Sequence, residues 1–376
     1  MSPLPRRVFY GSLIHSLTLT NLEVLPSALL GINQAGIIAF LDKSISPDQV
    51  EATIKSHGWE GAELVRLKRG EFLCPGFVDT HTHAPQYPNL SFGQQYELLD
   101  WLTHVTFPTE AKFADAQYAR RTYEGVVQRV INTGTTTCAY YGTLHLTTKI
   151  LAAVCHRKGQ RAFVGRCNMD RNALPEYQEK DATTSLSDTH AFISFVRSRC
   201  ISPTSSTSPD GLLVPGIPPT STNLVEPILT PRFAISCSDE VLTGLGEMMR
   251  EDPTLALQTH LAENPSEIAF SRELFPFAES YTHIYDHFNL LRNNTILAHC
   301  VHLEPKEMEL IKLRNSGVSH CPTSNFNLRS GISDISEMLD RGIKVSLGTD
   351  VSGGFGLGIL TTLCAFSLPH SIATQR

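Results

Sequence analysis

The chain has 376 residues and a formal net charge of −6, and 41% of its residues are apolar and 18% are charged. This composition is typical of a globular protein, and the length fits a barrel with a small second domain. The negative charge argues against nucleic acid and against an anionic membrane as partners, because both favour basic patches.

The first part of the chain has the pattern of short strands. Residues 1–72 contain alternating runs such as "LTLTNLEVL" and "AGIIAFLD", with turn residues between them. Alternation of apolar and polar residues with a period of two is typical of strands that have one buried face. We therefore expect residues 1–72 to form a small β-strand domain.

From residue 73 onward, apolar runs typical of buried strands alternate with longer helical stretches. Two of the helical stretches, "AQYARRTYEGVVQRVINTG" and "PKEMELIKLRNSG", are each closed by a glycine, a common end signal for helices. The alternation predicts an α/β fold, a (β/α)₈ TIM-like barrel over residues 73–376. The eight strand candidates are "FLCPGFVDTH", "GTTTCAYYG", "RAFVGRCNMD", "LVEPILTPRF", "LALQTHLAE", "TILAHCVHL", "GVSHCPTSN" and "KVSLGTD".

One stretch interrupts this alternation. Residues 200–223, "CISPTSSTSPDGLLVPGIPPTSTN", are rich in serine, threonine and proline. Such a composition indicates a flexible surface loop.

The cysteines and the apolar runs indicate the compartment. The nine cysteines are scattered singly without a C-x-x-C pair, which favours reduced thiols over a disulfide framework. The start, "MSPLPRRVFYGSLIHSL", lacks the continuous apolar core of a signal peptide, and no later run approaches a membrane span. We therefore expect a cytoplasmic protein.

Chemically capable side chains gather where the predicted strands end. Alternate residues of a strand share one face, so His81 and His83 should point the same way. The strand ends of a barrel meet at one face, where active sites lie. The other polar residues near strand ends are Arg232, His260, Glu263, His299 and Asp350.

Three histidines and one aspartate that converge on a point match the nitrogen and oxygen ligands of zinc. Glu263 follows His260 by three residues, so it could reach a water molecule at such a site without being a ligand. The competing interpretation treats each residue separately. His299 would then be a core histidine and Asp350 the N-cap of the following helix.

Several motifs resemble the amidohydrolase superfamily, which comprises metal-dependent hydrolases on a (β/α)₈ barrel. These motifs are "PGFVDTHTHAPQY", "GTTT", "TPRF", "THLAE", "AHCVHL", "HCPTSN" and "LGTD". More narrowly, "HTHAPQYPNL", "LLDWLTHVTFPTEAKF", "GQRAFVGRCNMD", "LPEY" and "LTPRFAISCS" resemble the guanine deaminases. The likeness runs from roughly residue 8 to residue 360, and its motifs are specific.

The resemblance implies the hydrolysis of guanine to xanthine and ammonia, a step of purine catabolism, with one Zn²⁺ per chain. It also implies a possible homodimer. The implied metal ligands are His81, His83, His260 and Asp350. The implied catalytic residues are Glu263 as proton shuttle, His299, which polarises the nucleophile or the tetrahedral intermediate, and Asp350. The implied substrate-binding residues are His83, Gln86, Arg232, Phe233, His260, Glu263 and Asp350.

Elementary chemistry agrees with these residue types. An oxo-purine offers acceptors on one edge, which suits the planar donor fork of Arg232. Phe233 could stack on the base, although packing in the core explains an aromatic residue there equally well. "LPEY" could be a lid element or a plain loop. The cytidine-deaminase type of zinc site needs P-C-x-x-C, and "HCPTS" reverses the Cys-Pro order.

Two other functions remain open at this stage. One is a deaminase or chlorohydrolase of the same superfamily that acts on another ring. The other is an inactive, C-terminally truncated chain, because the sequence stops at Arg376, barely one helix past Asp350. Members of the family continue with strands that complete the N-terminal β domain, so we expect this domain to lack its C-terminal part.

Overall fold

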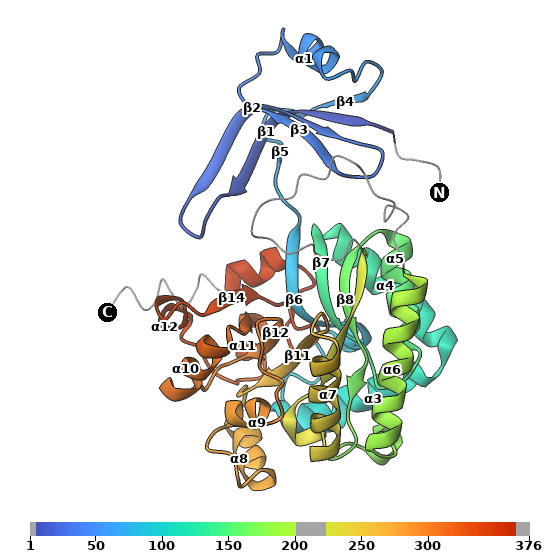
Figure 1. Ribbon diagram of the computed structural model, residues 1–376, viewed down its shortest axis with the longest axis vertical. Coiled ribbons are helices and arrows are strands. Elements are labelled where there is room, and N and C mark those ends of the chain that lie inside the picture. Colours follow the sequence, from blue (N-terminus) through green and yellow to red (C-terminus); the bar gives the residue numbers. More distant parts are fainter. Residues whose placement is uncertain (1–4, 201–222, 366–376) are drawn as a thin grey trace. The chain divides into compact units, whose positions relative to one another are not determined.

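A computed structural model describes residues 5–200 and 223–365 of the chain (Figure 1). Apart from its two end residues, the predicted loop at 200–223 lies outside this described part. Two compact units divide the chain, Met1–Gly76 and Phe77–Arg376.

The first unit contains a small sheet and one helix. Its strands follow the order β3-β2-β1-β4, with β5 also paired to β1. β1 and β2 are antiparallel, whereas β4 and β5 run parallel to β1. Val8, Leu29, Val50, Ile54 and Trp59 form a buried cluster between the sheet and the helix. The elements are β1 (Arg7–Ser16), β2 (Leu22–Ile32), β3 (Ile38–Asp42), α1 (Val50–Ser56), β4 (Glu63–Arg66) and β5 (Phe72–Leu73).

The second unit is built on parallel strands in the order β14-β13-β12-β11-β10-β8-β7-β6, with β9 paired to β10. β8 and β9 are two parts of one predicted strand, separated by Arg166, so eight strand positions surround the centre. The predicted barrel fold is thereby confirmed. The strands are β6 (Phe77–His83), β7 (Thr135–Tyr141), β8 (Arg161–Gly165), β9 (Cys167–Asn168), β10 (Val225–Pro231), β11 (Ala256–Leu261), β12 (Thr295–His299), β13 (Gly317–His320) and β14 (Lys344–Leu347).

Side chains and main-chain groups join the first barrel strand to the last. The Thr80 hydroxyl lies 2.8 Å from the Ser346 hydroxyl and donates to the Leu347 carbonyl at 3.0 Å. Just beyond, the Asp350 amide donates to the His81 carbonyl at 2.9 Å. These contacts form a seam between β6 and β14. The seam brings together residues of the first and the last barrel strand, which are far apart in the sequence.

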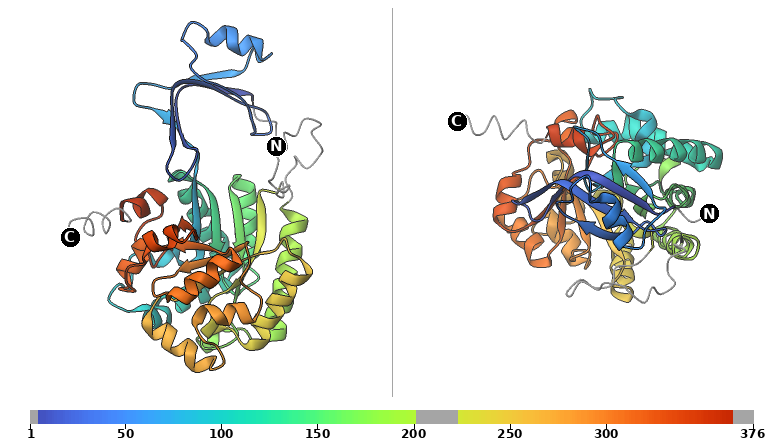
Figure 2. Two further views of the ribbon diagram at one scale, coloured as in Figure 1. Left: turned by 60° about the vertical axis from the view of Figure 1, so that its left-hand side comes forward. Right: turned by 90° about the horizontal axis from the view of Figure 1, so that it is seen from above.

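Helices cover the outside of the barrel strands (Figure 1 and the left view of Figure 2). α4 turns Tyr123, Val126 and Val130 inward, and Asp115 caps its first amides. The longer helices are α4 (Ala116–Asn132), α5 (Thr148–Lys158), α6 (Ala182–Arg199), α7 (Asp239–Glu251), α8 (Pro265–Leu274), α9 (Tyr281–His287), α10 (Pro305–Arg314), α11 (Pro322–Asn327) and α12 (Ile335–Asp340). Short helices near the strand ends are η1 (Ala84–Asn89), α2 (Leu98–Trp101), η2 (Leu102–Thr106), α3 (Phe107–Ala111), η3 (Lys112–Ala114), η4 (Pro175–Tyr177) and η5 (Ala234–Ser236).

Two details differ from the sequence-based expectations. The segment "FLCPGFVDTH" is not one barrel strand, because β5 pairs with β1 in the small sheet and only β6 enters the barrel. Pro75 and Gly76 separate the two, as expected for residues that interrupt strand pairing. α10 ends at Arg314 with Asn315 in the left-handed conformation (φ 55°), and Gly317 already belongs to β13.

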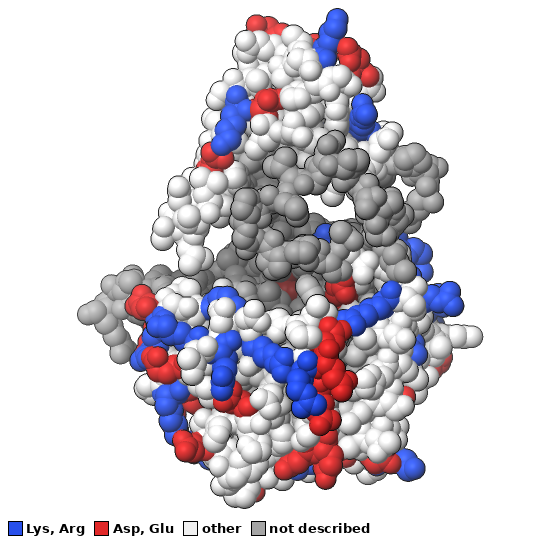
Figure 3. Space-filling view, viewed as in Figure 1, with Lys and Arg blue, Asp and Glu red and all other residues white. Residues whose placement is uncertain are grey.

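The surface of the barrel unit is mixed in charge. On the face drawn in Figure 3, lysine and arginine side chains are interspersed with aspartate and glutamate. Ion pairs of the barrel unit include Arg314 with Asp286 at 2.6 Å and Arg272 with Glu304 at 3.1 Å. Among the described residues, no helix is long and apolar enough to cross a membrane.

Candidate active site

The predicted pair on β6 points toward the centre of the barrel. His81 and His83 are both buried, and their ring centroids lie 5.0 Å apart. This is the shared face that their i, i+2 spacing predicts for a strand. His260, at the end of β11, stacks against His83 with ring centroids 5.2 Å apart.

These three histidines meet Asp350, which follows β14. One potential ligand atom from each of the four residues lies within 4.8 Å of all the others. Asp350 Oδ1 is 3.2 Å from His81 Nε2 and 3.4 Å from His83 Nε2. His83 Nε2 is 3.2 Å from His260 Nε2. The structure therefore brings together four residues from three strand ends that the sequence analysis selected as ligands.

The donor atoms have the properties that a cation needs. His81 Nε2 is buried and, apart from its 3.2 Å contact with Asp350 Oδ1, has no hydrogen-bond partner among the described residues. Burial lowers the pKa of His83 and of His260 well below the usual value, so both imidazoles are neutral. Metals bind neutral imidazole and ionised carboxylate.

Neighbouring groups fix the protonation states of these donors. His260 Nδ1 lies 2.5 Å from the Arg232 carbonyl oxygen. Nδ1 must donate to this acceptor, so the lone pair of Nε2 faces the cluster. Burial by itself would raise the pKa of Asp350, but the interactions with His81, His299 and His83 together outweigh it and hold this pKa well below its usual range. Residues of this kind, three nitrogen donors and one oxygen donor, fit a divalent metal such as zinc.

The strand ends around the cluster have an uncommon backbone. Ala262, His299, Cys300 and Asp350 all have positive φ angles, between 46° and 70°. Side chains other than glycine rarely adopt this region, and such residues concentrate at functional sites. The surrounding hydrogen bonds, including the Cys300 amide to the Leu261 carbonyl at 3.0 Å, hold the chain in this conformation.

Glu263 lies beside the cluster and keeps its own hydrogen bonds. Its carboxylate accepts from the Ser330 hydroxyl at 3.1 Å and lies 3.4 Å from His299 Nε2. Burial raises its pKa from 4.5 to about 7. A carboxyl group with this pKa can both take and release a proton near neutral pH. Glu267 supports the loop by accepting from the Glu263 amide at 3.0 Å.

His299 is held between two carboxylates. Its Nε2 is 3.4 Å from Glu263 and 3.7 Å from Asp350, while Nδ1 lies 2.9 Å from the side-chain oxygen of Asn325. Burial alone would lower its pKa, but the charges of Glu263 and Asp350 outweigh burial, and the pKa is raised. The competing interpretation made His299 a core histidine and Asp350 a helix N-cap. It does not explain why both side chains contact the other charged and imidazole groups of this site.

A cavity opens beside the cluster. Its polar lining includes His83, His260, Glu263 and Asp350, together with Gln86 and Arg232. Its apolar lining consists of Leu98, Trp101, Leu102, Phe233 and Leu328. The cavity is small, with a volume of about 20 Å³. Every residue predicted from the sequence to touch a substrate therefore lines one cavity.

Phe233 both lines the cavity and packs in the core, and its stacking on a base stays a prediction. Its ring lies edge-on to His260 with centroids 5.9 Å apart and lines the cavity, and the same ring packs in a buried cluster with Leu98 and Trp101. Tyr177 of the "LPEY" segment is fully buried in that cluster.

Sequence reasoning missed Glu110. This residue of α3 is fully buried, and its carboxylate contacts both Arg232 and Gln86. Its partners lie far away in the sequence, so no local spacing marks it. A buried acidic residue beside two cavity residues becomes visible only in the folded chain.

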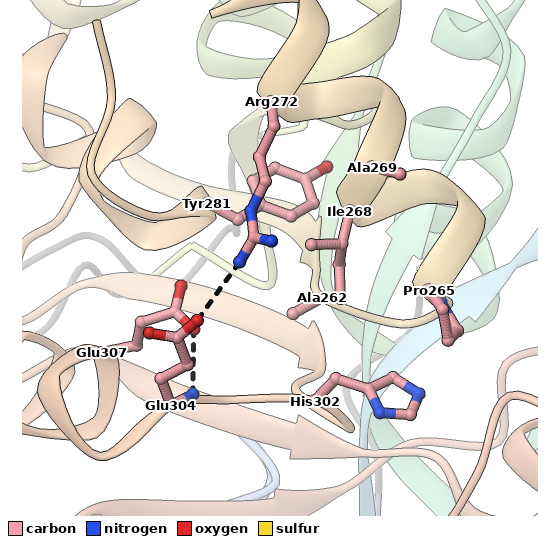
Figure 4. Close-up of a pocket in the computed structure, with 9 residues that line it drawn as sticks. All are labelled: Ala262, Pro265, Ile268, Ala269, Arg272, Tyr281, His302, Glu304 and Glu307. Atoms are coloured by element: carbon pink, nitrogen blue, oxygen red, sulfur yellow. Dashed lines mark hydrogen bonds and ion pairs between the residues drawn. The ribbon is translucent and has the colours of Figure 1, made fainter. Parts of the chain in front are cut away.

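A larger cavity of about 290 Å³ lies between α8, α9 and α10 (Figure 4). Its charged groups bind one another, because Arg272 pairs with Glu304 and the Glu304 amide donates to Glu307 at 2.9 Å. It lacks the set of donor atoms without partners that marks the strand-end cavity, so we assign the chemistry to the strand ends. The lining residues are Ala262, Pro265, Ile268, Ala269, Arg272, Tyr281, His302, Glu304 and Glu307.

The comparisons with known proteins agree with this geometry. The amidohydrolase family model matches residues 72–371. The chain is 43% identical to the "probable guanine deaminase" of Schizosaccharomyces pombe over 370 residues, 98% of this chain and 65% of that relative. It is 41% identical to the guanine deaminase of Dictyostelium discoideum, over 95% of this chain and 76% of that relative. The chain thus spans about two thirds to three quarters of the length of these curated relatives.

Solved structures give the same picture. The guanine deaminase of C. acetobutylicum with bound guanine in the active site matches with a TM-score of 0.80 and 34% identity, over 94% of this chain and 76% of that chain. A triazine hydrolase from Arthrobacter matches with a TM-score of 0.75 but only 17% identity, which shows a shared fold alone. The metal-ligand cluster at the strand ends of a barrel, together with the family match, places the chain in the amidohydrolase family. Within that family, it belongs with the guanine deaminases.

Proposed function

We propose that this chain hydrolyses guanine to xanthine and ammonia as a zinc-dependent deaminase of purine catabolism. The observation that carries the proposal is that Glu263, a buried carboxyl group with a pKa of about 7, lines the same cavity as His83, His260 and Asp350 of the four-residue cluster. The relatives named guanine deaminase support guanine as the substrate.

We assign the metal to His81, His83, His260 and Asp350 and its identity to zinc. The support is the donor set of three nitrogens and one carboxylate oxygen. The Arg232 carbonyl accepts from Nδ1 of His260 and so orients one of these donors. When bound, zinc supplies Lewis acidity that makes hydroxide available near neutral pH.

Glu263 is the proton carrier in this proposal. It takes a proton from the attacking water as oxygen adds to the ring carbon that bears the amino group. It delivers that proton to the neighbouring ring nitrogen. It then moves the proton of the added hydroxyl to the amino group, so that the carbon–nitrogen bond breaks, ammonia leaves and the added oxygen becomes the new carbonyl. The sum is guanine and water to xanthine and ammonia. His299, 3.4 Å from Glu263, is placed to polarise the oxygen that adds to the ring.

Arg232, Gln86 and Phe233 hold the purine in this proposal. Arg232 and Gln86 supply donors for the oxo edge, and Phe233 supplies an apolar face beside His260. His83, His260, Glu263 and Asp350 contact the ring carbon and the leaving amino group. A buried donor that is built to bind an oxo group also rejects rings that lack one, because the donor would stay unpaired.

A substrate panel tests the proposal. Purified protein supplemented with zinc should release ammonia from guanine, and far less from adenine, cytosine or an aminotriazine. A preference for the triazine would instead support the second candidate function, hydrolysis of another ring, which the shared fold with triazine hydrolase also permits. No ammonia from any ring would contradict the assignment of a deaminase.

We also propose that the protein works in the cytosol. Cys74 and seven buried cysteines are free thiols. Free thiols are typical of a reducing compartment. Fractionation of cells expressing a tagged chain would check this.

A further inference from the structure

The Glu110 carboxylate is the centre of a buried hydrogen-bond network at the wall of the strand-end cavity. Oε2 accepts from Arg232 Nη1 at 2.7 Å and from the Tyr177 hydroxyl at 2.6 Å. Oε1 accepts from Arg232 Nη2 at 3.1 Å and from Gln86 Nε2 at 2.9 Å. Each oxygen has two donors, so every acceptor position of the carboxylate is filled.

The network fixes the two residues that face the cavity. A bidentate contact sets the plane of the Arg232 guanidinium, because two parallel hydrogen bonds leave it no rotation. The Phe107 ring lies 5.2 Å from the guanidinium carbon and supports this plane. Gln86 is fixed at both ends of its amide, since its Oε1 accepts from the Ser352 amide at 3.1 Å while Nε2 donates to Glu110.

Donors remain for a ligand after these contacts are made. Arg232 uses one hydrogen of each Nη on Glu110, and its buried Nε has no partner among the described residues. Gln86 Nε2 carries a second hydrogen beyond the one that Glu110 accepts. Both side chains line the cavity, so we infer that a bound molecule would accept from these spare donors.

The network also cancels charge. Arg232 and Glu110 are both fully buried, and their contact forms an ion pair in which every acceptor position of the carboxylate is filled. An isolated buried cation would favour an anionic ligand, whereas a paired one offers directed donors without a net charge. A wall of this kind suits a neutral ring that carries an oxo group.

We propose that Glu110 is a positioning residue that makes the cavity selective for neutral oxo-purines by orienting Arg232 and Gln86 and by neutralising Arg232. This inference rests on the proposed function, because it names how that same site recognises its substrate. Glu110 touches no reacting atom in it and acts through its two neighbours.

Glu110→Gln tests the proposal with little change in shape. The amide would place a donor against the donors of Arg232, Tyr177 or Gln86 and would leave the guanidinium without its counter-charge. The readout is binding, measured by calorimetry with two ligands that cannot be deaminated: hypoxanthine, which has the oxo group, and purine, which lacks it. We expect hypoxanthine affinity to fall about 10-fold or more while purine affinity stays nearly constant.

A matched control is the buried pair of Arg166 and Glu179. Glu179 also accepts from a buried arginine and from the Met169 amide at 2.7 Å, but neither member of the pair lines the cavity. Glu179→Gln should therefore lower the melting temperature without changing the ratio of hypoxanthine to purine affinity. If Glu110 were merely structural, Glu110→Gln would behave in the same way as this control.

The outcomes separate this inference from the proposed function. Wild-type protein that releases no ammonia from guanine overturns the function. Wild-type protein that does release ammonia, together with an unchanged affinity ratio in Glu110→Gln, overturns the role of Glu110. If Glu110→Gln does not fold, the affinity ratio of Tyr177→Phe tests the role of Glu110 instead. This variant removes one hydrogen-bond donor from the Glu110 carboxylate and keeps the charge of that carboxylate. A reduced ratio, about 3-fold, then supports the positioning role, and an unchanged ratio overturns it.

Discussion

Burial and neighbouring charges together set the pKa values of the side chains at the strand ends. Burial raises the pKa of Glu263 and lowers the pKa values of His83 and His260. In each case burial favours the neutral form of the side chain. Asp350 alone stays ionised, because the surrounding histidines outweigh burial. The same buried environment thus produces one ionised carboxylate, neutral imidazoles and a carboxyl group that exchanges its proton near neutral pH.

Glu263→Gln should abolish most of the turnover and leave the metal in place. The amide keeps the contact with Ser330 but cannot carry a proton, so kcat for guanine should fall about 10²–10⁴-fold. Steady-state kinetics and elemental analysis of the same sample measure both quantities. Glu273→Gln, an exposed position on α8, is the control and should keep normal kcat. Near-normal turnover in Glu263→Gln would remove this residue from the mechanism.

Glu263 should also shape the stability of the metal-free protein. Its pKa is raised to about 7 in the folded chain, so between about pH 4.5 and 7 the folded state holds a proton that the unfolded state has released. The free energy of unfolding therefore falls as pH rises through this window, by at most roughly 1.4 kcal/mol per pH unit. Urea unfolding of chelated wild-type protein and Glu263→Gln should diverge in this window, with the wild type losing more. Parallel pH curves for the two proteins would contradict the shift.

Secondary-structure elements differ in how well the sequence predicts them. The i, i+2 spacing of His81 and His83 sufficed to predict a shared face, because strand geometry is local. The prediction that "FLCPGFVDTH" forms one barrel strand was wrong, because an apolar run does not reveal that its two parts join different sheets. Glu110 was invisible because its contacts with Gln86, Tyr177 and Arg232 span 24, 67 and 122 residues. Long-range contacts of this kind arise from tertiary packing, which no sequence window contains.

The hydrogen bonds of the seam between β6 and β14 should contribute measurably to the free energy of unfolding. Thr80→Val removes a hydroxyl that contacts Ser319 at 2.7 Å and Ser346 at 2.8 Å, and leaves those groups with one partner fewer. We expect a loss of about 1–3 kcal/mol in the free energy of unfolding, measured with urea. Thr183→Val, at an exposed position of α6, provides the control and should change stability little. Equal stability of the two variants would show that the hydroxyl does not hold the seam.

At the scale of the barrel unit, the candidate metal site ties distant parts of the chain together. His81, His260 and Asp350 come from β6, β11 and the end of β14, so a single ion would cross-link three strands. A ligand that binds only the folded state stabilises that state by mass action. Metal binding and barrel closure should therefore be coupled.

Loss of one ligand should reveal this coupling. Wild-type protein purified without chelator and supplemented with zinc should contain about one zinc per chain, and His81→Ala should lose most of it because one of four ligands is gone. A chelator should lower the melting temperature of wild-type protein and barely affect that of His81→Ala. His190→Ala, at an exposed position of α6, should match the wild type. Wild-type metal content near zero would overturn the ligand assignment.

The small volume of the strand-end cavity has a kinetic consequence. A volume of about 20 Å³ holds about one water molecule, far less than a purine ring occupies. In the proposed reaction, residues that line the cavity would therefore have to move apart before guanine enters and again before xanthine leaves. Each catalytic cycle then contains two opening events, and motions of this type take microseconds to milliseconds. Their rate sets an upper bound on turnover that no improvement of the chemical step could exceed.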